Sequence, residues 1–259
     1  MRDAAKRRGV VHAVGLQARV SAPVNFLKDL IADGYVGRVL SCTMVSSRQN
    51  YGATVARDKA WALDRSRGYS LLMNGHTIDA VRFCLGEFAE VSAVLGVGFP
   101  ETKVRETGEV VRKDAPDQVL VSGRLESGAF VSIHQRDGTH NASGLLFEVN
   151  GTEGDLILST PVSAGVQYAD VTFRGARRGP DGERTALAEI PIPAGYRWVP
   201  ADVPPGNPLN VAQQYAQFSE AFRTGKPVVR ADFDVAVDLH RTLDAIQRAA
   251  DTGRRVSLH

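Results

Sequence analysis

The stretch QVLVSGRLESGAFVSIHQ, residues 118–135, decides the fold class of this chain. Two runs rich in apolar and β-branched residues, 118–125 and 129–135, flank the turn-forming triplet Glu126-Ser127-Gly128, a pattern typical of a β-hairpin. Four more strand-like stretches lie around this hairpin, at 91–97, 145–149, 155–159 and 166–173. Consecutive strands without helices between them favour antiparallel pairing. The chain is therefore predicted to hold a large, mostly antiparallel sheet.

Helical segments precede and follow this strand-rich region. Ser21 and Pro23 supply a helix start, and Gly34 is placed to end that helix after apolar residues at helical spacing. Three further helices are predicted from the same apolar spacing, at 78–85, 209–224 and 232–252. The expected architecture is α+β, with helices packed on one face of the sheet.

The remaining segments are less regular. Residues 2–8 are typical of a basic helix, and residues 10–17 and 37–47 of strands. Residues 49–69 lack periodicity and are predicted to form a long ordered loop, a type of segment that is often functional. Residues 191–208 hold six of the twelve prolines and are expected to run extended across the surface.

Composition and charge restrict the classes of function. The chain has 259 residues, of which 43% are hydrophobic and 23% charged, and its net charge is +2. This length supports a full core without disulfide or metal staples, and the balanced charge does not favour a nucleic-acid partner. Cys42 and Cys84 are too few for a disulfide framework or a zinc site and indicate a reducing, cytoplasmic setting. No apolar run approaches the ~20 residues of a membrane span.

The most specific local feature is NGHTID, residues 74–79, at the start of a predicted helix. His76 and Asp79 are three positions apart and therefore share a helix face. A helix N-terminus disfavours the imidazolium, so a neutral His76 could accept a proton or donate a hydrogen bond near neutral pH, with Asp79 orienting it. The alternative is structural: His76 caps or packs the helix, and Asp79 stabilises its N-terminus electrostatically.

Other candidate binding residues are scattered along the chain. Gln17 and Arg19 follow the first predicted strand, where strand-to-helix loops commonly hold ligands, and Arg19 suits a phosphate or carboxylate. Arg136 lies on a predicted strand, and Trp61 and Tyr69 lie in the long loop, where they are candidates to line a pocket. Each has a plainer alternative, as a surface arginine or as aromatic cover for the sheet.

Four motifs, in this order, resemble the glucose-fructose oxidoreductase and inositol dehydrogenase (Gfo/Idh/MocA) family. They are VHAVGLQAR (11–19), DGYVGRV (33–39), GHTID (75–79) and NGTEG (150–154). The two closing helices are also similar to those of the family. The succession spans nearly the whole chain, and it is most similar to the subgroup that includes the fungal galactose-regulon repressor and related bacterial oxidoreductases.

The resemblance implies the fold of that family's sheet domain, which is like the C-terminal domain of glyceraldehyde-3-phosphate dehydrogenase. Residues 1–20 would be the last helix and strand of a mostly missing Rossmann domain, and residues 21–259 the α+β domain for substrate binding and oligomerisation. NAD or NADP would bind a complete protein, and neither is expected to bind this chain alone. The open sheet face is expected to pair with a second copy in a dimer or tetramer.

The implied activity is hydride transfer between a nicotinamide cofactor and a sugar or polyol. In that reading His76 is the catalytic residue near the reacting oxygen, and the resemblance implies no metal site. The implied substrate-binding residues are Gln17, Arg19, Trp61, Asp79 and Arg136.

Two departures from the family pattern leave the enzyme assignment open. The family's dinucleotide fingerprint and catalytic lysine have no counterpart, since Gly96-Val97-Gly98 ends a strand and lacks the third glycine. The family places an aspartate four residues before the histidine, where this chain has Leu72, which cannot accept a proton. The alternative is therefore a non-catalytic ligand-sensing or protein-binding module similar to the galactose-regulon repressor.

Overall fold

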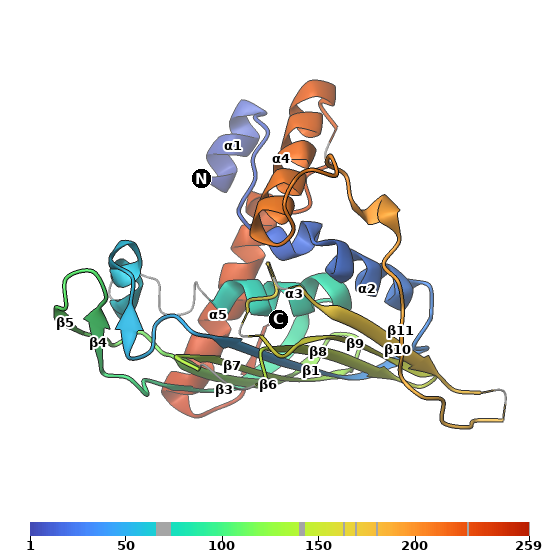
Figure 1. Cartoon of the computed structure of the whole chain (residues 1–259), viewed down its shortest axis with the longest axis horizontal. Helices are drawn as coiled ribbons and strands as arrows, with labels where there is room; N and C mark the ends of the chain where they lie inside the picture. Colours follow the sequence, from blue (N-terminus) through green and yellow to red (C-terminus); the bar gives the residue numbers. More distant parts are fainter. Residues whose placement is uncertain are drawn as a thin grey trace.

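A large sheet organises the molecule. The structure is a computed structural model that describes the chain except at 66–73, 140–142, 163, 169, 180, 227 and 259. The sheet has nine strands in the order β11-β10-β9-β8-β1-β7-β6-β3-β12 (Figure 1). β1 and β7 are parallel, and the other neighbouring pairs are antiparallel, which confirms the predicted sheet. The strands are β1 (Val39–Arg48), β3 (Phe88–Gly96), β6 (Gln118–Leu125), β7 (Phe130–Asp137), β8 (Leu145–Gly151), β9 (Gly154–Thr160), β10 (Thr172–Arg177), β11 (Ala188–Glu189) and β12 (Val256–Ser257).

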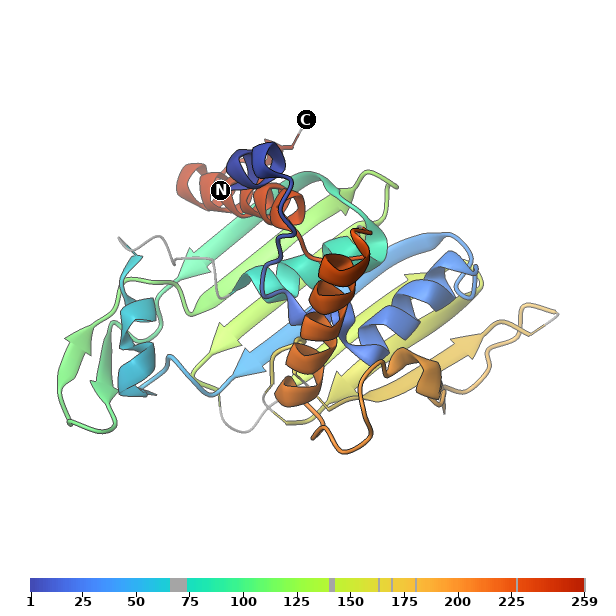
Figure 2. The ribbon, with the colours of Figure 1, turned by 90° about the horizontal axis from the view of Figure 1, so that it is seen from above.

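Helices cover one face of this sheet (Figures 1 and 2). The core lies between the two layers, where Leu27 and Ile78 from helices pack with Met44 and Phe147 from strands. Burial of these apolar side chains is the main stabilising term of the fold. The α-helices are α1 (Arg2–Arg8), α2 (Ala22–Ala32), α3 (Gly75–Leu85), α4 (Asn207–Thr224) and α5 (Phe233–Thr252), and the 3-10 helices are η1 (Gln17–Val20), η2 (Arg57–Leu63) and η5 (Ala194–Tyr196).

A small lobe lies at one end of the sheet (Figure 1). It consists of η2 and a second sheet of β2 (Thr54–Val55), β4 (Glu101–Val104) and β5 (Val110–Arg112), in the order β2-β4-β5. The lobe has its own apolar cluster, which includes Tyr51 and Val104. The loop predicted over 49–69 from its lack of periodicity contains β2 and η2 in its described part. β2 is too short to be recognised in the sequence, and its partner β4 lies almost fifty residues away.

The segment from residue 10 to residue 16 differs from the prediction. The basic helix α1 is present, but residues 10–16 form no strand within the described chain. A strand needs a neighbouring strand for its backbone hydrogen bonds, and this segment bonds elsewhere: the Val14 amide donates to the Ala231 carbonyl at 2.8 Å, and the Gln214 side chain donates to the Val14 carbonyl. The predicted strand at 166–173 is also displaced, since β10 begins only at Thr172.

The turn between β8 and β9 shows why the motif NGTEG contains two glycines. Neither glycine has a positive φ, so conformational freedom does not require them. The constraint is space: a Cβ on Gly151 would overlap the Val36 carbonyl, and one on Gly154 would lie 2.6 Å from the Ala176 carbonyl oxygen. The backbone of the hairpin therefore packs directly against the backbone at Val36 on one side and at Ala176 on the other.

No helix in the described part of the chain is long and apolar enough to cross a membrane.

The substitution Gly151→Ala is expected to lower the free energy of unfolding by about 1–3 kcal/mol, because the added methyl group must displace the Val36 backbone. Gly195→Ala is the matched control, since a Cβ at Gly195 meets nothing within 4 Å. Urea unfolding of both variants measures the difference. Equal stability of the two variants would contradict the packing argument.

Candidate functional site

His76 lies in the first turn of α3, where the sequence placed it. Its Nδ1 atom is buried and has no hydrogen-bond partner within the described chain. Burial and, to a smaller extent, the nearby Arg48 guanidinium lower the pKa of His76 to about 4, while Asp79 opposes the shift. The imidazole is therefore neutral at pH 7, with a ring nitrogen available to a ligand.

A buried ion pair lies close to His76, at the ends of two parallel strands. Arg48 on β1 and Asp137 on β7 are register partners. The Arg48 guanidinium donates from Nε and Nη2 to the two Asp137 carboxylate oxygens, at 2.7 and 2.8 Å. Both residues are about 95% buried, so the two charges neutralise each other locally. Sequence analysis missed this pair, because its partners are 89 residues apart.

A second buried pair connects this position to the small lobe. Lys113 Nζ donates to Asp117 Oδ2 at 2.7 Å and also to the Tyr51 carbonyl. Although burial opposes it, the hydrogen bonds from Lys113 and from two backbone amides lower the pKa of Asp117. The Asp137 amide in turn donates to the Asp117 carbonyl at 2.8 Å. The Lys113–Asp117 pair thus helps to hold Asp137, and with it the Arg48–Asp137 ion pair, in position.

Two further polar side chains lie two residues before Arg48 and Asp137 on the same strands. Ser46 and Gln135 are also register partners on β1 and β7, and they are 1% and 2% exposed. Ser46 Oγ and both amide atoms of Gln135 are buried without a hydrogen-bond partner in the described chain. Side chains alternate along a strand, so both residues point to the same face as Arg48 and Asp137. Neither residue was singled out from the sequence.

Arg19 and Asp79 are brought together as the sequence suggested, but they bind each other. Arg19 donates from Nε and Nη2 to the two Asp79 oxygens, both at 2.8 Å, and Asp79 is fully buried. Arg19 also donates to the Arg230 carbonyl at 3.2 Å. This bidentate pair joins η1 to α3 and fixes the turn that carries His76.

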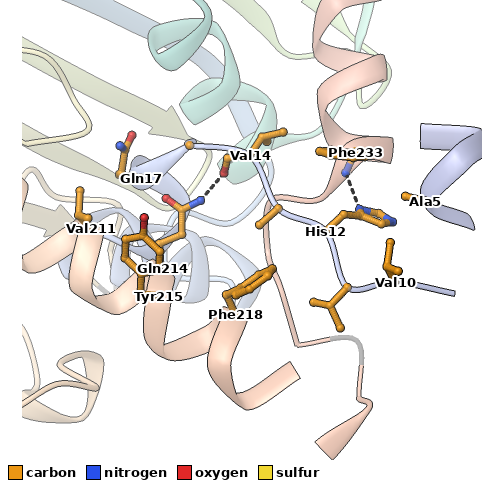
Figure 3. A pocket seen from close by; sticks show the side chains of 13 residues that line it. Ala5, Val10, His12, Val14, Gln17, Val211, Gln214, Tyr215, Phe218 and Phe233 are labelled. Atoms are coloured by element: carbon orange, nitrogen blue, oxygen red, sulfur yellow. Dashed lines mark hydrogen bonds between the residues drawn. The ribbon is translucent and has the colours of Figure 1, made fainter. Parts of the chain in front are cut away.

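Gln17 begins η1 and borders a separate cavity of about 510 Å³ (Figure 3). The walls are mainly apolar and come from 10–15, α4 and Phe233; the His12 ring stacks on Phe233 at 4.7 Å. The Phe233 amide donates to His12 Nδ1 at 3.1 Å. The lining holds no lysine or arginine.

Arg136 and Trp61 occupy other places. Arg136 follows Gln135 on β7 and therefore points to the opposite, open face of the sheet, where it donates to Ser47 Oγ at 2.8 Å. Trp61 lies in η2 of the small lobe and is 38% exposed. Tyr69 and Leu72 lie outside the described residues.

The described residues contain no group of three side chains suited to hold a metal ion. The polar cluster around His76 is instead made of hydrogen-bonding groups and balanced charges. Its unpartnered atoms belong to Ser46, His76 and Gln135, which suits recognition of a polar ligand.

Comparisons with known proteins agree with this fold. A family model described as "Gal80p, C-terminal domain" matches residues 23–160. Levoglucosan dehydrogenase of Pseudarthrobacter phenanthrenivorans is 30% identical over 198 residues, which are 69% of this chain and 50% of that protein. The galactose/lactose metabolism regulatory protein GAL80 of Saccharomyces cerevisiae is 26% identical over 206 residues, 74% of this chain and 47% of the regulator. The chain thus spans about half the length of these relatives.

Solved structures show the same fold. Levoglucosan dehydrogenase in complex with NADH and levoglucosan has a TM-score of 0.81 at 24% identity, over 99% of this chain and 68% of that one. A super-repressor mutant of Gal80p from Saccharomyces cerevisiae has a TM-score of 0.78 at 21% identity, over 99% of this chain and 67% of that one. With a family model that matches more than half of its residues, the chain belongs to the Gal80p C-terminal domain family of the Gfo/Idh/MocA superfamily.

Proposed function

We propose that residues 21–259 form the substrate-binding and oligomerisation domain of an NAD- or NADP-dependent oxidoreductase that acts on a sugar or polyol in the cytoplasm. Residues 1–20 would be the end of its dinucleotide-binding domain. The observation that carries the proposal is His76, a buried neutral imidazole with an unpartnered nitrogen in the first turn of α3. The similarity to a levoglucosan dehydrogenase supports the substrate class.

In this proposal the chain's own residues bind the substrate and handle its proton. His76 accepts the proton of the reacting hydroxyl at its free nitrogen, as a general base does. Asp79 and Arg19 act as positioning residues, because their buried pair fixes the first turn of α3, which carries His76. Gln17 lines the separate cavity beside α4 and Trp61 lies in η2 of the small lobe, so in this proposal neither contacts the reacting hydroxyl. In this proposal the nicotinamide chemistry is supplied by a dinucleotide-binding half.

A form of the protein that carries a dinucleotide-binding half is expected to oxidise a sugar or polyol with NAD or NADP. His76→Ala is expected to lower kcat about 10²- to 10⁴-fold, because the proton acceptor is removed. His240→Ala on the exposed part of α5 is the matched control. The 259-residue chain alone should give no saturable change in NADPH fluorescence. Turnover that survives His76→Ala would contradict the assignment.

A second candidate function is a ligand-sensing or protein-binding module without turnover. Two GAL80 regulators are among the relatives, at 26% and 29% identity, and Leu72 replaces the family's acidic residue. Absence of turnover across a broad panel of sugars, together with specific retention of a partner protein on a column, would favour this module. Sugar-dependent reduction of NAD or NADP would favour the enzyme.

The pH dependence of stability tests the burial of neutral His76. Its pKa is about 4 in the folded chain and 6.5 in the unfolded chain, so between these values only the unfolded state binds the proton. Stability should therefore fall as the pH falls from 6.5 to about 4, by at most about 1.4 kcal/mol per pH unit. His76→Gln should lack this contribution when urea unfolding is measured across the range. Parallel pH profiles for the two proteins would contradict it.

We also propose that the open sheet face pairs with a second copy. Strand alternation leaves apolar side chains on the face opposite the helices, and a sheet with one uncovered apolar face needs a partner layer. Val94 and Leu120 are cross-strand neighbours there, at 67% and 43% exposure, and Phe130 is 66% exposed. Arg136 lies on this face, beside Ser47.

Phe130→Asp is expected to weaken self-association at least tenfold, because it places a charge in the proposed apolar interface. Sedimentation velocity over a range of concentrations measures the effect. Val162→Asp, which changes an equally exposed residue outside the sheet, serves as the control. A parent chain that stays monomeric at all concentrations would overturn the proposal.

A further inference from the structure

Ser46 and Gln135 stand out among the buried polar groups of the described chain. As register partners on parallel strands, their backbones are about 4.8 Å apart, so the two side chains stand next to each other. A buried amide or hydroxyl without a partner costs free energy, and native structures almost always satisfy such groups. Here three polar atoms of two neighbouring residues lack partners together. Such a cluster indicates a ligand that supplies the missing hydrogen bonds.

The position of this pair places it beside the proposed reaction site. Arg48 and Asp137 follow two residues later on the same strands and point to the same face. α3, which carries His76, packs against β1, and Arg48 is near enough to His76 to lower its pKa. Ser46 and Gln135 therefore lie on the face of the sheet that α3 covers, two residues before Arg48 and Asp137 along the strands.

The charges around the pair restrict the ligand. Arg48 and Asp137 neutralise each other through two hydrogen bonds, and Arg19 and Asp79 do the same. His76 is neutral at pH 7. A carboxylate or phosphate placed here would lose its hydration, and the described residues around the pair offer it no uncompensated cation, which makes its binding costly. The surroundings suit an uncharged ligand.

We propose that Ser46 and Gln135 form a subsite that binds two neighbouring hydroxyl groups of an uncharged polyol or sugar. The Gln135 amide offers a carbonyl acceptor and an NH₂ donor, and the Ser46 hydroxyl can donate and accept, which matches a pair of hydroxyl groups. This inference rests on the proposed function and specifies its substrates as uncharged polyols or sugars, with sugar acids and sugar phosphates excluded. Gln135 would position the polyol for His76.

The test combines binding and stability of the 259-residue chain. Levoglucosan, L-sorbose and myo-inositol are titrated into ¹⁵N-labelled protein, with gluconate as the charged comparator. The side-chain NH₂ signals of Gln135, assigned by their loss in Gln135→Leu, should shift with the neutral ligands. Gln135→Leu should weaken binding about tenfold, and Ser46→Ala somewhat less. Gluconate should bind at least tenfold more weakly than the best neutral ligand.

Melting temperatures separate a ligand subsite from a structural role. Gln135→Leu should leave the melting temperature of the ligand-free chain unchanged or raise it, because a leucine needs no hydrogen bonds. Ser132→Ala, an exposed hydroxyl deletion on the same strand, controls for nonspecific effects. A lower melting temperature with unchanged affinity would overturn the subsite, since the amide would then be satisfied within the fold.

The remaining outcomes distinguish the two proposals. If the parent chain binds a neutral polyol and both variants bind it equally well, the subsite is wrong and the proposed function stands. If none of the polyols shifts any signal at millimolar concentration, the proposed function fails and the subsite fails with it.

Discussion

The parallel pairing of β1 with β7 is the constraint on which the site depends. It is the single parallel pair in the sheet's described strands, and its register sets Ser46 beside Gln135 and Arg48 beside Asp137. Because side chains alternate, a slip of β1 by one residue would turn Ser46 and Arg48 toward the open face and away from Gln135 and Asp137. The bidentate ion pair opposes such a slip, since breaking it would leave two buried charges unpaired. Register and site geometry are therefore stabilised by the same contact.

This constraint also explains which parts of the molecule were predictable. The hairpin of β6 and β7 is local, with a glycine turn between two apolar runs, and its sequence pattern is sufficient to identify it. The start of α3 at His76 is likewise encoded by neighbouring residues, so the sequence pattern identifies it too. The pairs Arg48–Asp137 and Ser46–Gln135 join residues 89 positions apart in a parallel register, and no short-range pattern encodes that. The sequence thus indicated the histidine but not the polar groups that surround it.

In the segment before η1, the sequence predicted a strand that the structure does not contain. Residues 10–16 have the apolar composition of a strand, yet no described strand lies beside them. The Val14 carbonyl instead accepts a hydrogen bond from Gln214 on α4, and the His12 ring accepts one from the Phe233 amide at the start of α5. The apolar side chains of the segment line the cavity beside Phe233. The apolar composition of a segment indicates that its side chains can be buried. Whether the segment forms a strand depends on a neighbouring strand elsewhere in the structure.

The proximity of Arg48 affects an enzyme and a sensor differently. A cation that lowers the pKa of His76 weakens the histidine as a base. Asp137 holds the Arg48 charge in a bidentate ion pair, so Arg48 gives little compensating stabilisation to an alkoxide that develops on a bound hydroxyl. A reaction that removes the hydroxyl proton therefore works against the low pKa of His76. For a sensor no proton moves, and the low pKa serves only to keep the imidazole neutral as a hydrogen-bonding group. The low pKa of His76 thus opposes turnover and is neutral for binding, so the proton balance between His76 and its ligand distinguishes an enzyme from a sensor.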